Sequence, residues 1–274
     1  MYPLDESSQR LSQERIDQEA QAQAKMQMID EATSAIQETR AALQSLNKKN
    51  IPQAKTALER ALGKLDVALA SHPSVGLLPV AIAVRVVDMN ADEETLRRIT
   101  GEAKELMNMG RYQSARILLQ DLVSELEIRT ENLPLASYPS AIRAAIAAID
   151  QNKLPEAITK LTAALQSLVI VQSAIPLPII RAQALIDEVN QKSKDSKLDK
   201  AQAIKLLTAA DQQVNLAQKL GYGTRRDDYK SLHASIKALQ DNFNKSREST
   251  GLLAEVRNSL QSLKEKIVKA ASSK

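Results

Sequence analysis

The chain has 274 residues, 43% of them hydrophobic and 2% aromatic, and its 37 basic and 33 acidic residues give a net charge of +4. Cysteine is absent, which excludes disulfides, thiolate zinc sites and a cysteine nucleophile. The two signs of charge are interspersed, whereas binding to nucleic acid requires basic residues gathered on one face, so we expect no nucleic-acid partner.

The apolar residues are also too dispersed for a membrane protein. No segment approaches the roughly 20 uninterrupted apolar residues of a membrane span, and the first residues lack the apolar core of a signal peptide. We therefore expect a soluble protein with no membrane span. Its expected compartment is the periplasm if a leader has been removed before this numbering begins, and the cytoplasm otherwise.

The first 25 residues are polar and rich in glutamine, which predicts a polar N-terminal arm or a projecting helix over 1–25. We predict a main helical domain over 26–245 and a C-terminal amphipathic helix over 246–274. Ala, Leu, Gln, Glu, Lys and Arg favour helices throughout. The predicted helices span 8–49, 52–71, 92–109, 111–126, 138–151, 154–169, 177–192, 199–220, 225–248 and 251–271.

Four segments share a helix–turn–helix pattern when they are aligned on an alanine. A leucine follows each alanine four residues later, on the same helix face. Such hairpins resemble those of tetratricopeptide arrays, but the alanines are 61, 42 and 46 residues apart, whereas a solenoid needs a nearly constant period. We therefore favour dissimilar hairpins in one compact domain. The aligned pairs are Ala54 with Leu58, Ala115 with Leu119, Ala157 with Leu161, and Ala203 with Leu207.

The turns of the first three hairpins carry Asn50, Gly110 and Asn152. Asn and Gly are the residues that most readily adopt the left-handed conformation that ends a helix. We therefore predict that each of these residues terminates the helix before it.

Between the first two hairpins, β-branched residues alternate over 80–87 after Leu78-Pro79, a pattern that predicts a strand. Its candidate partners are 126–135 and 168–178, which follow the second and third hairpins. The sequence thus predicts a mainly α fold, with helix hairpins packed in a bundle-like domain and a small β-sheet of two or three short strands.

The last two predicted helices carry apolar stripes at helical spacing, including Leu232 and Ile236 in one and Val256 and Leu260 in the other. These stripes could pair with each other or with another subunit. Long amphipathic helices at both ends lead us to expect a homo-oligomer.

The joint between the helices 199–220 and 225–248 reads LGYGTRRDDY and combines glycines, tyrosines, arginines and aspartates. Gly221 is expected to end one helix, and Thr224 to cap the next with Asp227 in a capping box. Two arginines at a helix start oppose the helix dipole, so capping does not explain them. The candidate binding residues are Tyr222, Arg225, Arg226 and Tyr229.

The order of these elements resembles the YfdX family of bacterial proteins over residues 26–245. The resemblance is carried by Leu78-Pro79-Val80 and its strand, NMGRYQSARILL, Leu133-Pro134-Leu135, DQNKLPEAITKLTAAL, and Leu220-Gly221-Tyr222 before Tyr229-Lys230-Ser231-Leu232. It implies a role in acid and other bacterial stress responses, export to the periplasm in many members, and no enzymatic activity that can be transferred.

Motifs for chemistry are absent. His72 and His233 lie in unrelated segments without ligand-like spacing, and neither a nucleophile elbow nor a phosphate loop occurs. We expect no catalytic residue, no metal, no cofactor and no enzymatic activity. The leading hypothesis is a non-enzymatic helical binding protein linked to bacterial stress. The alternatives are a holdase-like chaperone for unfolded clients, and a small-molecule-binding protein or enzyme with a pocket between the hairpins and the sheet.

Overall fold

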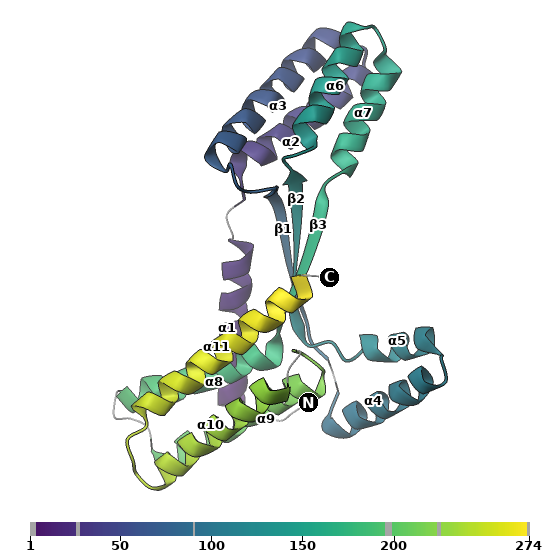
Figure 1. Cartoon of the computed structure of the whole chain (residues 1–274). Coiled ribbons are helices and arrows are strands. Elements are labelled where there is room, and N and C mark those ends of the chain that lie inside the picture. Colours follow the sequence, from purple (N-terminus) through teal and green to yellow (C-terminus); the bar gives the residue numbers. More distant parts are fainter. Residues whose placement is uncertain (1–3, 26–27, 90, 195–198, 224–225, 273–274) are drawn as a thin grey trace. The chain divides into compact units, whose positions relative to one another are not determined.

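The computed structural model describes residues 4–25, 28–89, 91–194, 199–223 and 226–272. In these ranges the chain forms eleven helices and three strands (Figure 1). The predicted fold class is confirmed, because the helices pack as hairpins in bundles and the strands form a small three-stranded sheet. The chain divides into two compact units, unit 1 with Met1–Gln23, Val84–Ile128 and Ser173–Lys274, and unit 2 with Ala24–Ala83 and Arg129–Gln172.

Unit 2 is built from two helix hairpins that share one core. The first hairpin is α2 (Asp30–Asn47) with α3 (Ile51–Ser71), and the second is α6 (Tyr138–Asp150) with α7 (Leu154–Gln166). Helix α2 contacts α7 and α3 contacts α6, so the four helices form a bundle (Figure 1). The aligned residues Ala54, Leu58, Ala157 and Leu161 are all fully buried in its core. Small alanines let the helices approach, and the leucines one turn later fill the space between them.

Unit 1 contains a second bundle. Helices α8 (Leu177–Lys194) and α9 (Lys200–Lys219) form a hairpin, α10 (Arg226–Asn244) packs on α9, and α11 (Thr250–Ser272) packs on α8 and α10. Leu207, Ile236 and Leu260 are fully buried in its core, so the two predicted C-terminal stripes pack against each other and against α8 and α9. The remaining helices of unit 1 are α1 (Glu6–Ala24), α4 (Glu93–Asn108) and α5 (Tyr112–Gln120).

The four predicted hairpins do not stack in chain order. The first and third pack together in unit 2, while the second and fourth belong to unit 1. The unequal spacing of the aligned alanines therefore correctly argued against a regular solenoid.

The sheet consists of β1 (Leu77–Val87), β2 (Glu125–Pro134) and β3 (Val169–Pro176), in the order β1-β2-β3. Each strand has residues in both units: β1 and β3 run from unit 2 into unit 1, and β2 runs back, so neighbouring strands are antiparallel. The strand predicted after Leu78-Pro79 and both of its candidate partners are thus confirmed. Leu78 of β1 belongs to the core of unit 2, and Leu126 of β2 is fully buried.

The single helix predicted over 8–49 is wrong, because α1 and α2 are separate helices. Ile29, just before α2, has an extended backbone with φ −87° and ψ 107°. Its N–H donates to the carbonyl oxygen of Pro79 at 2.9 Å, and the Thr33 hydroxyl donates to that of Val80 at 3.4 Å. Pairing with the start of β1, a contact distant in sequence, replaces helical continuation here.

Helix α5 also ends earlier than predicted, at Gln120 instead of residue 126. Ser124 is fully buried, and its carbonyl oxygen accepts the N–H of Leu177 at 2.9 Å. The residues that follow α5 therefore turn and enter β2, where the sheet uses their backbone hydrogen-bonding groups.

The turn predictions hold for two of the three hairpins. Gly110 and Asn152 adopt positive φ, at 74° and 60°. In the first hairpin Lys49 takes this conformation instead, with φ 60°. Asn50 is the N-cap of α3, where its side chain accepts the N–H of Gln53 at 3.3 Å. Asn50 thus begins one helix rather than ending the other, which is the alternative use of asparagine at helix ends.

Candidate functional site

The joint that contains the candidate residues 222–229 is confirmed as a helix stop. Gly221 and Gly223 have φ of 81° and 87°, which favour glycine. The N–H of Tyr222 donates to the carbonyl oxygen of Ala217 at 3.1 Å, and that of Gly221 to Gln218 at 3.1 Å. These bonds satisfy the last carbonyls of α9, as a helix end of this kind requires.

The two tyrosines of the joint are hydrogen-bonded to each other within unit 1. Tyr229 is 3% exposed, and its hydroxyl donates to the carbonyl oxygen of Tyr222 at 2.6 Å. Burial raises the pKa of both tyrosines. Thr224 and Arg225 lie outside the described residues, and Arg226 is the first residue of α10. A binding role for these residues stays a prediction.

Tyr222 is part of a series of hydrogen bonds that the sequence did not predict. Its hydroxyl accepts the N–H of Ser124 at 3.1 Å, and the Ser124 hydroxyl donates to Asp88 at 2.7 Å. The second carboxylate oxygen of Asp88 is paired with the guanidinium of Arg181. The series thus connects the joint, the end of β1, the start of β2 and α8. Its members are far apart in sequence, so no local motif could reveal them.

Helix α1 is held against α8, α9 and α11, mainly by polar contacts. Asp5 caps α1 by accepting the N–H of Ser8 at 2.8 Å, and it pairs with Lys205 of α9 at 2.6 Å. Ile16 is the one hydrophobic residue among the three that α1 buries, the others being Ser8 and Ser12. The hydrogen bonds from Lys205 and Ser8 hold the pKa of the Asp5 carboxyl well below its usual range.

Between α1, α8, α9 and the end of β1 lies a cavity of about 520 Å³, called here the larger cavity. Its volume falls in the range of small-molecule sites, which is roughly 300–1,000 Å³. Four of its lining residues are apolar and eight are polar or charged, among them Asp88 and Arg181. The lining residues are Leu4, Glu6, Gln9, Arg10, Ser12, Gln13, Ile16, Asp88, Met89, Arg181, Gln213 and Leu216.

Two polar residues of the larger cavity each have a buried oxygen without a hydrogen-bond partner among the described residues. Ser12 is 2% exposed and Gln213 is 1% exposed. The Ser12 hydroxyl and the side-chain carbonyl oxygen of Gln213 are both buried without a partner. A buried polar group without a hydrogen bond lowers the stability of the fold by about 1–3 kcal/mol, so such groups are rare in natural proteins. Ser12 and Gln213 resemble ordinary polar helix residues in the sequence, and only the packing distinguishes them.

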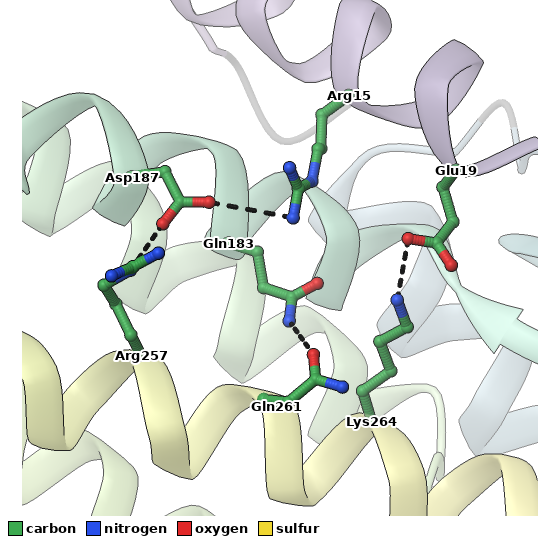
Figure 2. Close-up of polar contacts among 7 residues, drawn as sticks. All are labelled: Arg15, Glu19, Gln183, Asp187, Arg257, Gln261 and Lys264. Atoms are coloured by element: carbon green, nitrogen blue, oxygen red, sulfur yellow. Dashed lines mark hydrogen bonds and ion pairs between the residues drawn. The ribbon is translucent and has the colours of Figure 1, made fainter. Parts of the chain in front are cut away.

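A polar cluster under α1 joins this helix to α8 and α11 (Figure 2). Glu19 of α1 and Lys264 of α11 form an ion pair at 2.7 Å, with side chains only 13% and 12% exposed. Burial raises the pKa of Glu19, but the hydrogen bonds from Lys264 and Gln23 and the charge of Lys264 outweigh it, so the pKa is lowered overall. Asp187 of α8 pairs with both Arg15 of α1 and Arg257 of α11 (Figure 2).

The hairpin of α4 and α5 exposes more apolar surface than predicted. Ala115 is buried as expected, but Leu119, aligned with three fully buried leucines, is 39% exposed. Tyr112 and Ile117 are 66% and 60% exposed. A shallow groove of about 310 Å³ runs beside them, between Met107 and Val123.

Metal and membrane sites are not evident in the part of the chain that the structure describes. It contains no group of three or more His, Asp or Glu side chains arranged to hold a metal ion. None of its helices combines the length and the apolar character that crossing a bilayer requires.

Comparison with known proteins identifies the family. One solved structure that resembles the chain is that of YfdX from Salmonella Typhi, with 15% sequence identity and a TM-score of 0.38. The similarity covers 55% of this chain and 93% of that chain. No curated protein matches. The family model described as YfdX protein matches residues 35–174, just over half of the sequence. The chain therefore belongs to the YfdX family, and the resemblance inferred from the order of its elements is confirmed.

Proposed function

We propose that this chain is a non-enzymatic binding protein that holds a small molecule in the larger cavity. The observation that carries the proposal is the pair of buried oxygens on Ser12 and Gln213, unpartnered in residues that line a cavity of ligand size. A ligand that donates a hydrogen bond to the Gln213 carbonyl would remove the cost of burying it unpartnered. The family match covers residues 35–174, so α1, α8 and α9, which together supply most of the lining residues, lie outside it.

The lining defines the class of ligand. Leu4, Ile16 and Leu216 offer an apolar wall, which favours a ligand with an apolar part. Gln213 requires an N–H or O–H donor, and Arg181 offers further donors to an acceptor. The expected ligand is therefore amphipathic. Asp88 and Arg181 are engaged with each other and Asp88 also with Ser124, so their charges stabilise the wall and no catalytic role is assigned to them.

The test is a thermal-shift screen of amphipathic carboxylates, amines, alcohols and amides. A compound that binds only the folded chain raises Tm with concentration, and its affinity is then measured by calorimetry. Gln213→Leu should weaken the binding of the best compound about tenfold or more, because the accepting oxygen is lost. Gln183 does not line the larger cavity and provides the control. Gln183→Leu should leave the affinity for that compound unaltered.

The fold of the variant can be checked without ligand. Because Gln213→Leu removes an unpartnered buried oxygen, its own Tm should equal or exceed that of the parent. Ser12→Ala provides a second variant with a smaller change. A screen without any stabilising compound, or a compound bound equally by both variants and the parent, would refute the proposal.

Other functions keep weaker support. A holdase would bind unfolded clients through exposed apolar stripes on its terminal helices, but Val256, Leu260 and their neighbours on α11 are buried within unit 1. Exposed large apolar residues lie elsewhere, on α3, α4, α5 and the strands β1 and β3. Binding of unfolded clients, homo-oligomer formation and a role in bacterial stress therefore stay predictions.

A further inference from the structure

A second cavity, called here the smaller cavity, lies between α1, α8 and α11. Its volume is about 210 Å³, which at about 30 Å³ per water molecule corresponds to roughly seven waters. It shares no lining residue with the larger cavity. The residues that line it are Arg15, Gln183, Asp187, Arg257, Asn258, Leu260 and Gln261.

The charged groups of the smaller cavity carry an excess of positive charge. The lining contains one carboxylate, that of Asp187, and two guanidinium groups, those of Arg15 and Arg257. The Nε of Arg257 donates to Asp187 at 2.6 Å. The guanidinium of Arg15 is 3.7 Å from the other carboxylate oxygen, too far for a hydrogen bond. The lining thus has room for one more negative charge, and Arg15 retains donors that its ion pair does not satisfy.

Gln183 adds an acceptor that no group among the described residues satisfies. The residue is 7% exposed, and its amide nitrogen donates to the side-chain oxygen of Gln261 at 3.2 Å. Its own side-chain oxygen is buried and has no partner. In Figure 2 this oxygen points away from Gln261. Because a buried acceptor favours a donor, a ligand here needs an N–H or O–H group as well as a negative charge.

We propose that the smaller cavity binds a small carboxylate that carries its own hydrogen-bond donor, as hydroxy acids and amino acids do. The carboxylate would lie against the guanidinium groups of Arg15 and Arg257, and the hydroxyl or amino group would donate to Gln183. This binding site is independent of the larger cavity and of the function proposed for it.

The test compares L-lactate with propionate, two carboxylates that differ by one hydroxyl group. Titration calorimetry or ligand-observed NMR, in a phosphate-free buffer, measures both affinities. The parent chain should bind lactate about tenfold or more tightly than propionate, because propionate leaves the Gln183 oxygen unsatisfied. L-alanine should share the preference, since its amino group is also a donor.

Variants separate the two parts of the site. Gln183→Leu should abolish the preference for lactate over propionate, and Arg15→Gln should weaken the binding of both. Gln213→Leu in the larger cavity should change neither. Should Gln183→Leu fail to fold, Arg15→Gln still tests the carboxylate contact, because Arg15 is partly exposed and its single ion pair is long. Equal binding of lactate and propionate by the parent, or no binding of either, would overturn the proposal.

Discussion

Glu125, at the start of β2, shows how one partly buried carboxylate responds to pH. Burial raises its pKa, a contact with Tyr222 partly opposes this, and the nearby charge of Glu127 adds to the rise. The folded chain therefore binds the Glu125 proton more tightly than the unfolded chain. Its ionised form destabilises the fold at neutral pH, and this effect disappears as the pH falls through the raised pKa toward the ordinary value of 4.5.

The first prediction follows from the raised pKa of Glu125, which makes its ionised form destabilising. Glu125→Gln removes the buried charge, so its Tm should exceed that of the parent by a few degrees at pH 7 to 8. The difference should shrink below about pH 4.5, where the parent side chain is protonated as well. Differential scanning calorimetry across this range measures the effect, with Glu131→Gln on the same strand as the control. A gap that stays constant with pH would contradict the account.

Helix α1 is the element whose attachment depends most on charge. Asp5 and Glu19 have lowered pKa values because of Lys205 and Lys264, and few apolar groups support the helix. A lowered pKa stabilises the fold above the ordinary values of 3.8 and 4.5, and this stabilisation is lost as the pH falls through the folded values. Attachment of α1 should therefore weaken progressively in acid, as the pH falls from the ordinary values toward the lowered ones.

The second prediction is that α1 detaches before the bundle of α8 to α11 unfolds. Hydrogen exchange should show residues 6–24 losing protection at acid pH while α9 keeps it, after correction for intrinsic exchange rates. The double variant Asp5→Asn, Glu19→Gln should show the same loss at neutral pH. Retained protection of α1 in this variant at neutral pH would show that the ion pairs do not hold the helix.

The sequence predicted the elements better than it predicted the cavities. Hairpin alanines, strand alternation and Gly221 each act within a few neighbouring residues, and a local pattern is enough to find them. Ser12 and Gln213 line the same cavity from different helices, and each has the polarity expected of a helix surface. The break before α2 likewise depends on Ile29 meeting Pro79, fifty residues later. Contacts of this kind arise only from the packing of distant segments.

In the part of the chain that the structure describes, each unit has a large helix core of its own. Leu58 is fully buried in the core of unit 2, and Leu260 is fully buried in that of unit 1. Replacing a buried leucine by alanine typically costs about 2–5 kcal/mol, because transfer energy is lost and a cavity remains. The cost should be felt first in the unit that contains the change.

The third prediction compares these two positions. Leu58→Ala should increase hydrogen exchange in α2, α3, α6 and α7 and leave α8 to α11 close to the parent, whereas Leu260→Ala should do the reverse. Mass spectrometry of peptides from both units measures the two patterns in one experiment. An equal increase in both units for either variant would mean that they unfold as one cooperative body.

The division of the units along the chain also sets the order in which they can fold during synthesis. The last residue of unit 2 is Gln172, so its bundle can close on a ribosome before α8 to α11 have been made. Helix α1 emerges before the bundle of unit 2, whereas its partners α8, α9 and α11 are translated after that bundle. During synthesis α1 is therefore exposed before its partners exist. Because it buries only Ile16 and two serines in the folded chain, it then exposes little apolar surface that would promote aggregation.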